Sequence, residues 1–456
     1  MTPSTASPRL VDPRGNRLGT ASHEAADHVE TALWRMMSFF DTPQADLDAA
    51  GRADPGWALP QVMRAGFLLS LTEPAHLAEA HRLLEATEPK LAGATPRERA
   101  HYEAQLAVAE GRWQQACRIW DELLLEHPRD ALALQWAQLW DFYRGDSEGL
   151  RQRPARALPE WSEADPLFPY VLGLYAFGLE ENNLYPQAED VGRRAVAAEA
   201  RVPWAVHAVA HVMEMQGRFE DGAAWLRQHQ PGWAEGNGFA GHLWWHMGLF
   251  RLEALDIPGV QRLIDAHLCG AALQTTLQRL DAAALLWRMH LLGVDVGARF
   301  VELLRDWSPA DEDAGHHSFN DLHVLVALLG ADELVRAESW IARCAARVLA
   351  PEDARRSNHG AAREVALPVM RGLLAFARGD ADAAAAILHP ARSQARRLGG
   401  SHAQRDLIDQ TLLAAAARAS HRQVGRALLN ERRMAKPMTP LTRHWGEQLG
   451  LWVASP

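Results

Sequence analysis

The stretch GRWQQACRIWDELLLEHP, residues 111–128, decides the fold of this 456-residue chain. After its first glycine, apolar residues follow at helical steps and a proline closes the stretch: Gly111, Trp113, Ala116, Trp120, Leu123 and Pro128. Such a glycine lets one helix turn into the next, the alanine allows two helices to cross closely, and the proline ends the pair. The stretch therefore predicts the turn and second helix of a helix-pair repeat.

The same frame recurs further along the chain, first at Asn183, Tyr185, Ala188 and Ala195 and then at Gly217, Phe219, Gly222 and Leu226. Fainter copies surround Ala337, Gly379 and Ser420. A period near thirty-four residues with these residue types is typical of tetratricopeptide repeats. We therefore expect an all-α, tetratricopeptide-like superhelix, or solenoid, of roughly nine to eleven degenerate helix pairs.

The organisation predicted from this frame is one continuous array over residues 21–450. Residues 1–20 contain prolines, arginines and glycines and are expected to form a flexible arm, and residues 451–456 a short tail. The segments 153–165 and 309–317 are richer in proline and polar residues, and either could be a loop between repeats or an elbow, with 309–317 the possible elbow.

Composition excludes several classes of partner. The formal net charge is -10 and arginines alternate with acids along the helices, which argues against nucleic acid. No stretch approaches the apolar length of a membrane span, and the first twenty residues lack the apolar run of a signal peptide. The three cysteines, Cys117, Cys269 and Cys344, are far apart, so we expect no disulfide framework and a reducing, cytoplasmic setting.

Histidines gather on two neighbouring first helices. Trp204, His207, His211 and Glu214 follow one another at steps of three and four, so they form one stripe of a helix. In a tetratricopeptide frame this stripe faces the concave groove. Thirty-five residues after the first pair, His242 and His246 repeat the same spacing at equivalent positions. We therefore expect four imidazoles to converge on one patch of that groove.

This patch has three chemical interpretations. The four histidines could hold a divalent metal such as zinc, manganese or iron, assisted by Glu214 or by Asp321. Without metal, they and His323 could act as general acids and bases with Glu214. Alternatively, the imidazoles only bond neighbouring helices and stiffen the array.

Further residues are expected to line a ligand site. The aromatic walls would come from Trp204, Phe239 and Trp245. Asn320 and Asp321 precede His323 on another first helix, and a polar group, His402, Arg405 and Asp406, begins a helix that could fold back over the histidines. Arg405 would hold a carboxylate or phosphate, unless it simply pairs with Asp409 four residues on.

The segments AVHAVAHVMEM (residues 205–215) and HLWWH (242–246) resemble the tetratricopeptide repeat protein 38 family, and FNDLH (319–323) and residues 400–406 are similar to it too. The resemblance spans most of the chain, from roughly residue 24 to residue 429. It implies an α-solenoid of degenerate repeats and transfers no catalytic residue.

Three functions follow from the sequence. The first is a solenoid that binds a small polar molecule or a peptide in a histidine- and tryptophan-lined cavity. The second is a hydrolase or lyase that uses the same histidines, with metal or by acid–base chemistry. The third is a protein-interaction scaffold, although its groove positions would then be expected to hold lysine, arginine or asparagine. No phosphate-binding loop or nucleophile elbow supports other enzyme classes.

Overall fold

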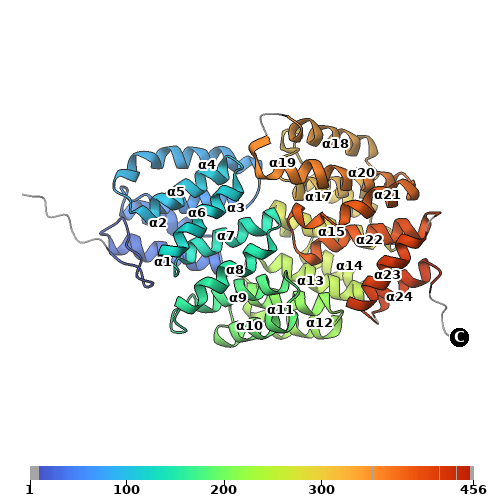
Figure 1. The fold of residues 1–456 in the computed structure, drawn as a ribbon, viewed down its shortest axis with the longest axis horizontal. Helices are drawn as coiled ribbons and strands as arrows, with labels where there is room; N and C mark the ends of the chain where they lie inside the picture. Colours follow the sequence, from blue (N-terminus) through green and yellow to red (C-terminus); the bar gives the residue numbers. More distant parts are fainter. Residues whose placement is uncertain (1–9, 351–353, 421, 438, 452–456) are drawn as a thin grey trace, which may run out of the picture. The chain divides into compact units, whose positions relative to one another are not determined.

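The computed structural model describes residues 10–350, 354–420, 422–437 and 439–451. Over these residues the chain is all-α, and helices follow one another in pairs (Figure 1). The first ten are α1 (His23–Ser38), α2 (Gln44–Ala53), α3 (Leu59–Ser70), α4 (Pro74–Thr87), α5 (Pro96–Ala109), α6 (Trp113–Glu126), α7 (Ala131–Arg144), α8 (Ser147–Ala157), α9 (Phe168–Glu180) and α10 (Tyr185–Ala198).

The pairs continue to the end of the described chain. They are α11 (Pro203–Met215), α12 (Phe219–Gln228), α13 (Ala240–Glu253), α14 (Ile257–His267), α15 (Thr276–Leu291), α16 (Gly297–Trp307), α17 (Ser318–Gly330), α18 (Leu334–Val348), α20 (Leu367–Ala377), α21 (Ala381–Arg392), α22 (His402–Arg418) and α23 (Gln423–Ala435), with α24 (Pro440–Gln448) last. A short helix, α19 (Ser357–Ala361), leads through a π-helical turn (Ala362–Ala366) into α20. The all-α, solenoid-like fold is as predicted, at the upper end of the expected number of pairs.

The glycines of the sequence frame end the first helix of their pairs. Gly111 and Gly217 have φ angles of 76° and 70°, a left-handed conformation that glycine adopts without a Cβ penalty. Residues with positive φ stand at the same place in most of the other pairs: Thr72, Gly145, Asn183, Leu255, Gly293, Asp332 and Gly379. The chain therefore reverses in the same way at the end of successive first helices.

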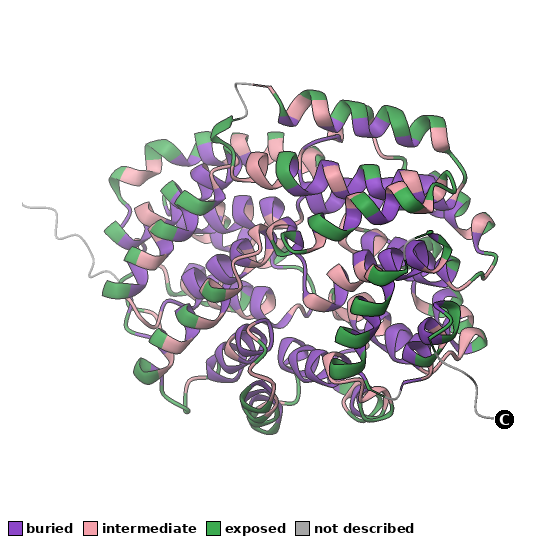
Figure 2. Cartoon of the chain, turned by 45° about the vertical axis from the view of Figure 1, so that its right-hand side comes forward, coloured by how far each residue is buried: buried purple, intermediate pink, exposed green. Residues whose placement is uncertain are grey.

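First helices form the core and second helices cover it. All residues of α17 are buried, whereas α18 buries a single stripe that includes Ala337, Trp340 and Cys344. In Figure 2 some helices are coloured as buried along most of their length, whereas others alternate between buried and exposed positions. A helix that is apolar on all sides must be enclosed by others, and one with a single apolar stripe lies at the surface. Side chains that are to meet inside the protein are therefore carried by first helices.

The chain divides into two compact units, and the boundaries between them do not fall at residues 309–317, the possible elbow in the predicted continuous array. Unit 1 takes in the described residues up to 141, with 147–205 and 232–238; unit 2 takes in 142–146, 206–231 and the described residues from 239 on. Within unit 1, residues 10–20 are not a flexible arm. Leu10 and Thr20 bond through their backbones, and the Arg14 guanidinium pairs with Glu30 of α1. Residues 1–9 and 452–456 lie outside the described residues.

Unit 2 closes on itself. Its first helices contact one another in succession, α13 with α15, α15 with α17, α17 with α20 and α20 with α22, and α22 also contacts α15. The indole Nε1 of Trp287 on α15 donates to the hydroxyl of Thr411 on α22, at 2.9 Å. α24 in turn packs on α13. Residues from the end of the chain are thereby placed beside residues of its middle.

Among the described residues, none of the helices combines the length and the hydrophobicity that a membrane span requires.

The repeat frame yields a matched pair of glycine substitutions. A Cβ at Gly222 on α12 would overlap the ring of buried Phe250, whereas nothing lies within 4 Å of a Cβ at Gly51 on α2. We expect Gly222→Ala to lower the free energy of unfolding by about 1–3 kcal/mol because the ring must move. Gly51→Ala should raise it by roughly 0.5–1 kcal/mol, the gain of alanine over glycine in a helix. Urea unfolding followed by circular dichroism measures both, and a stabilised Gly222→Ala variant would contradict the packing described.

Candidate functional site: a histidine cluster in unit 2

Four imidazoles from α11 and α13 meet in unit 2, as predicted from their spacing. His207 and His211 stand one helical turn apart on α11, and His242 and His246 do so on α13. The rings of His207 and His211 lie 4.3 Å apart between centroids, and those of His211 and His246 lie 4.5 Å apart. One nitrogen from each ring lies within 4.8 Å of those of the other three.

Two carboxylates fix the orientation of the rings on α13. His242 Nδ1 lies 2.8 Å from Asp281 Oδ2 of α15, and His246 Nδ1 lies 3.0 Å from Glu214 Oε2 of α11. A carboxylate only accepts hydrogen bonds, so both rings carry their proton on Nδ1. In the neutral form of such a ring the lone pair is on Nε2.

These Nε2 atoms point at one another. His242 Nε2 lies 3.2 Å from His246 Nε2 and 3.0 Å from His207 Nε2. For His242 and His246, which carry their proton on Nδ1, two lone pairs at this distance repel unless a positive charge lies between them. In a tetrahedral zinc site with bonds of 2.0–2.1 Å, ligand nitrogens are roughly 3.3 Å apart. The spacing of the three nitrogens therefore matches the edge of a metal coordination shell.

Three of the four imidazoles are deeply buried. His207 is 2% exposed and His211 and His246 are 0% exposed, while the His242 side chain retains 13%. Burial, and then the neighbouring imidazoles, lower the pKa of His207 well below its usual value, and burial does the same for His246. These two rings are therefore neutral, which is the form that binds metal.

Aromatic rings enclose the cluster on the side of α13. Phe239 contacts the rings of His207 and His242, at centroid distances of 5.0 and 4.9 Å. Trp245 is fully buried and stacks on His242 at 5.2 Å, with 18° between the planes. These two predicted ligand-site residues do lie beside the imidazoles.

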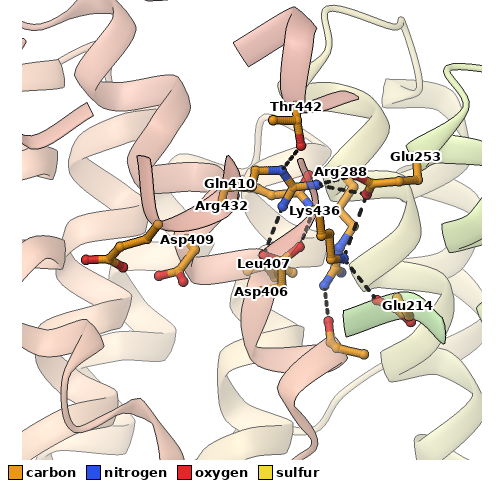
Figure 3. Close-up of polar contacts among 12 residues, drawn as sticks. Glu214, Glu253, Arg288, Asp406, Leu407, Asp409, Gln410, Arg432, Lys436 and Thr442 are labelled. Carbon is orange, nitrogen blue, oxygen red and sulfur yellow. Dashed lines mark hydrogen bonds and ion pairs between the residues drawn. The ribbon is translucent and has the colours of Figure 1, made fainter. Parts of the chain in front are cut away.

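An ion network joins Glu214 to the end of the chain (Figure 3). Lys436 Nζ lies 3.9 Å from Glu214 Oε1 and 3.8 Å from Glu253 Oε2. The Arg432 guanidinium donates to both oxygens of Glu253, at 2.9 and 2.8 Å, and lies 3.4 Å from Asp406 Oδ1. Burial raises the pKa of Glu214, and the Lys436 charge opposes the shift. Glu214 therefore connects the histidines to this network.

Glu214 lies behind the cluster. The sequence predicts that it completes or assists a metal site or acts as a general base, and it is not one of the four residues whose ligand atoms converge. One of its oxygens faces His246 Nδ1 and the other faces Lys436. Its position is that of an orienting group behind a ligand, a role that carboxylates commonly have in metal sites.

A cavity of about 200 Å³ adjoins the network. Met215, Arg392, Asp409 and Lys436 are among the residues that line it. Arg392 pairs with both oxygens of Asp409, at 2.7 and 3.0 Å, so the partner proposed for Arg405 is taken by another arginine. Water-sized molecules can therefore approach the outer side of the network.

Other predicted site residues lie in different surroundings. Trp204 belongs to unit 1, where its ring packs against Phe39 and Phe177 at 5.8 and 5.1 Å. On α17, the Nδ1 atom of His323 bonds to the carbonyl of Phe319 at 2.8 Å. Asn320 Oδ1 faces His317 Nδ1 at 3.0 Å. None of the α17 residues belongs to the convergent group of ligand atoms, and Trp204 is a packing residue.

Asp321 does not assist the histidines either. Its Oδ1 accepts the backbone N–H of Gly315 at 3.0 Å. Burial raises its pKa to about 7, although the Gly315 amide and the Arg347 charge act in the other direction.

The polar start of α22 is a helix cap whose side chains point several ways. Ser401 caps the helix and forms a capping box with Gln404, as its serine suggested. The Arg405 guanidinium donates to the carbonyl of Gly400, His402 is the first residue of the helix, and Asp406 meets the ion network. Asp406 therefore belongs to the ion network, which connects it through Arg432, Glu253 and Lys436 to Glu214.

Sequence reasoning missed Asp281, Arg288, Glu253, Arg432 and Lys436. Asp281 and Arg288 bracket the apolar run AAALLW (residues 282–287), seven residues apart on helix α15. Isolated charges in such a run must be buried and partnered, which could have marked both. Glu253, Arg432 and Lys436 lie in ordinary polar segments, and only the closure of unit 2 brings them together.

No protein-family model matches the chain.

The pKa of Asp321 yields a pH-dependent prediction. Its ordinary value is 3.8 and its value in the folded chain is about 7, so between these values only the unfolded chain ionises. Folding therefore becomes less favourable as the pH rises from 4 to 7, by roughly 3–5 kcal/mol. Asp321→Asn cannot ionise and its amide oxygen can still accept from Gly315. Its melting temperature relative to the parent should rise between pH 5 and pH 8 in calorimetry; a difference independent of pH would argue against a neutral Asp321.

Proposed function

We propose that unit 2 contains a metal centre, in which one divalent transition metal is bound by His207, His211, His242 and His246. The observation that carries the proposal is the convergence of three Nε2 atoms at 3.0 and 3.2 Å with carboxylates behind two of the rings. Histidine that ligates a metal through one nitrogen commonly donates its other N–H to a carboxylate. Asp281 and Glu214 are placed for this orienting role.

The metal would serve chemistry on a small polar molecule. A bound divalent ion polarises a carbonyl or phosphoryl oxygen, or lowers the pKa of a bound water. His242 is the one ligand of the four with appreciable exposure, and Phe239 beside it is half-buried, so a small molecule would approach from this side. A hydrolase or lyase is the enzyme class that this arrangement favours.

The burial of the rings speaks against a peptide-binding scaffold that uses these histidines. A groove that grips an extended peptide needs accessible side chains, and three of the four imidazoles are at most 2% exposed.

We also propose that the chain is related to the tetratricopeptide repeat protein 38 family. The segments 205–215, 242–246, 319–323 and 400–406 support this relationship.

Elemental analysis of protein purified without a histidine tag tests the centre. We expect roughly one equivalent of zinc, manganese or iron per chain, lost in the double variant His207→Ala, His242→Ala. His389→Ala on the exposed side of α21 is the control and should keep its metal. A parent protein that holds less than about a tenth of an equivalent after growth and dialysis with each metal rejects the proposal.

The carboxylate behind His242 gives a finer test. Asp281→Asn keeps the size of the side chain but removes the charge that holds the Nδ1 proton, so the metal dissociation constant should rise about 10- to 100-fold. Chelator competition measures the constant. The matched control is Asp265→Asn on α14, where the carboxylate is exposed and pairs with Arg299. If the metal dissociation constant rises equally in both variants, Asp281 has no specific role in metal binding.

A further inference from the structure

Unit 1 contains a cavity of about 320 Å³, and all the residues that line it belong to that unit. Part of the lining comes from the first helices α1, α3, α5 and α7, which contribute Val29, Leu33, Leu59, Met63, Arg97 and Leu132. Another part comes from residues 10–14 and Leu18, which precede α1. A cavity of this size, with mostly apolar walls and a few polar groups, can enclose a small organic molecule.

The residues that precede α1 form a hairpin that places an arginine in the lining. Val11 and Arg17 form an antiparallel bridge. In the turn between them, the N–H of Gly15 donates to the carbonyl of Asp12 at 2.9 Å, and Gly15 has a φ angle of 88°, which glycine adopts without strain. Arg14 lies in this turn, lines the cavity and is 3% exposed.

The two arginines of the lining each keep one N–H group without a hydrogen bond. Arg97, which is 5% exposed, donates from Nε and Nη2 to the two oxygens of Asp130, at 2.7 and 3.1 Å. Arg14 donates from Nη1 and Nη2 to the two oxygens of Glu30. Among the described residues, Arg97 Nη1 and Arg14 Nε are buried and have no partner. Because buried donors are costly to leave unbonded, this cavity suits a molecule that brings an acceptor.

Carboxylates already compensate the charges of both arginines. Burial acts to raise the pKa of Asp130, but the charges and hydrogen bonds of Arg97 and His101 together outweigh it and hold this pKa well below its usual value. Asp130 is therefore an ion paired with Arg97, and Glu30 is paired with Arg14 in the same way. Two further carboxylates line the cavity, those of Asp12 and Asp27. A bound anion would therefore meet no uncompensated cation.

We propose that this cavity binds a small, uncharged, largely apolar molecule with a carbonyl oxygen, which accepts a hydrogen bond from Arg97 Nη1. The apolar body of the molecule would lie against the leucine, valine and methionine side chains of the first helices. A charged ligand would lose its water without gaining a free counter-charge, and an ammonium group would face N–H donors. The proposal concerns unit 1 alone and does not depend on the metal centre of unit 2.

Three probes that share a cyclohexyl ring test the charge of the ligand: cyclohexyl methyl ketone, cyclohexanecarboxylate and cyclohexylmethylammonium. Met63 lines the cavity, so its methyl NMR signal, assigned by its loss in Met63→Leu, reports binding there and not at the metal centre. We expect the ketone to shift this signal saturably, with a dissociation constant below about 5 mM and at least about tenfold below those of the charged probes. No saturable shift with the ketone, or a charged probe that binds as tightly, overturns the proposal without any further variant.

A conservative substitution then tests the donor. Arg97→Lys keeps a positive charge beside Asp130 but removes the third nitrogen of the guanidinium, so the dissociation constant of the ketone should rise about tenfold. Arg99→Lys is the matched control on the same helix, because the Arg99 guanidinium bonds to the carbonyls of Leu91 and Ala94 and does not line the cavity. An unchanged constant in Arg97→Lys, or an equal rise in both variants, overturns the role of Arg97.

Discussion

The arrangement of unit 2 depends on two hydrogen bonds from imidazole N–H groups to buried carboxylates. Asp281 and Glu214 each hold the Nδ1 proton of one histidine on α13, and both lone pairs are thereby directed to the same point. The carboxylates come from α15 and α11, the helices on either side in the repeat order, so three successive first helices must keep their register for the imidazoles to meet. The packing of these three helices therefore also determines whether the four imidazoles can converge.

That constraint also explains why charged groups accumulate in the interior. A buried carboxylate needs a partner, and Glu214 has two, His246 and Lys436. Lys436 in turn meets Glu253, which Arg432 also holds. Each of these buried charges pairs with an oppositely charged neighbour, and the series of pairs leads to half-buried Asp406. The C-terminal part of unit 2 supplies these cations, and Lys436 reaches the histidine cluster through Glu214.

The sequence predicted most of what depends on local spacing. Helix pairs, their left-handed ends at Gly111 and Gly217, and the shared position of the four histidines all follow from residue type and period. It failed where contacts join distant segments. Asp281 and Lys436 belong to no motif, and the contact of α22 with α15 joins segments far apart in the sequence. Trp204 has the spacing of a site residue, but its ring packs in the core of unit 1.

The contact between α15 and α22 has a consequence for how unit 2 loses its structure. In an open repeat array each repeat touches only its neighbours, so the array can fray from an end one repeat at a time. Here Trp287 bonds Thr411 across intervening repeats, and Arg288 bonds the first turn of the same helix. Melting α22 would therefore expose α15, the helix that carries Asp281. Unit 2 is built to come apart in a single cooperative step, as a globular domain does, even though its sequence is written in repeats.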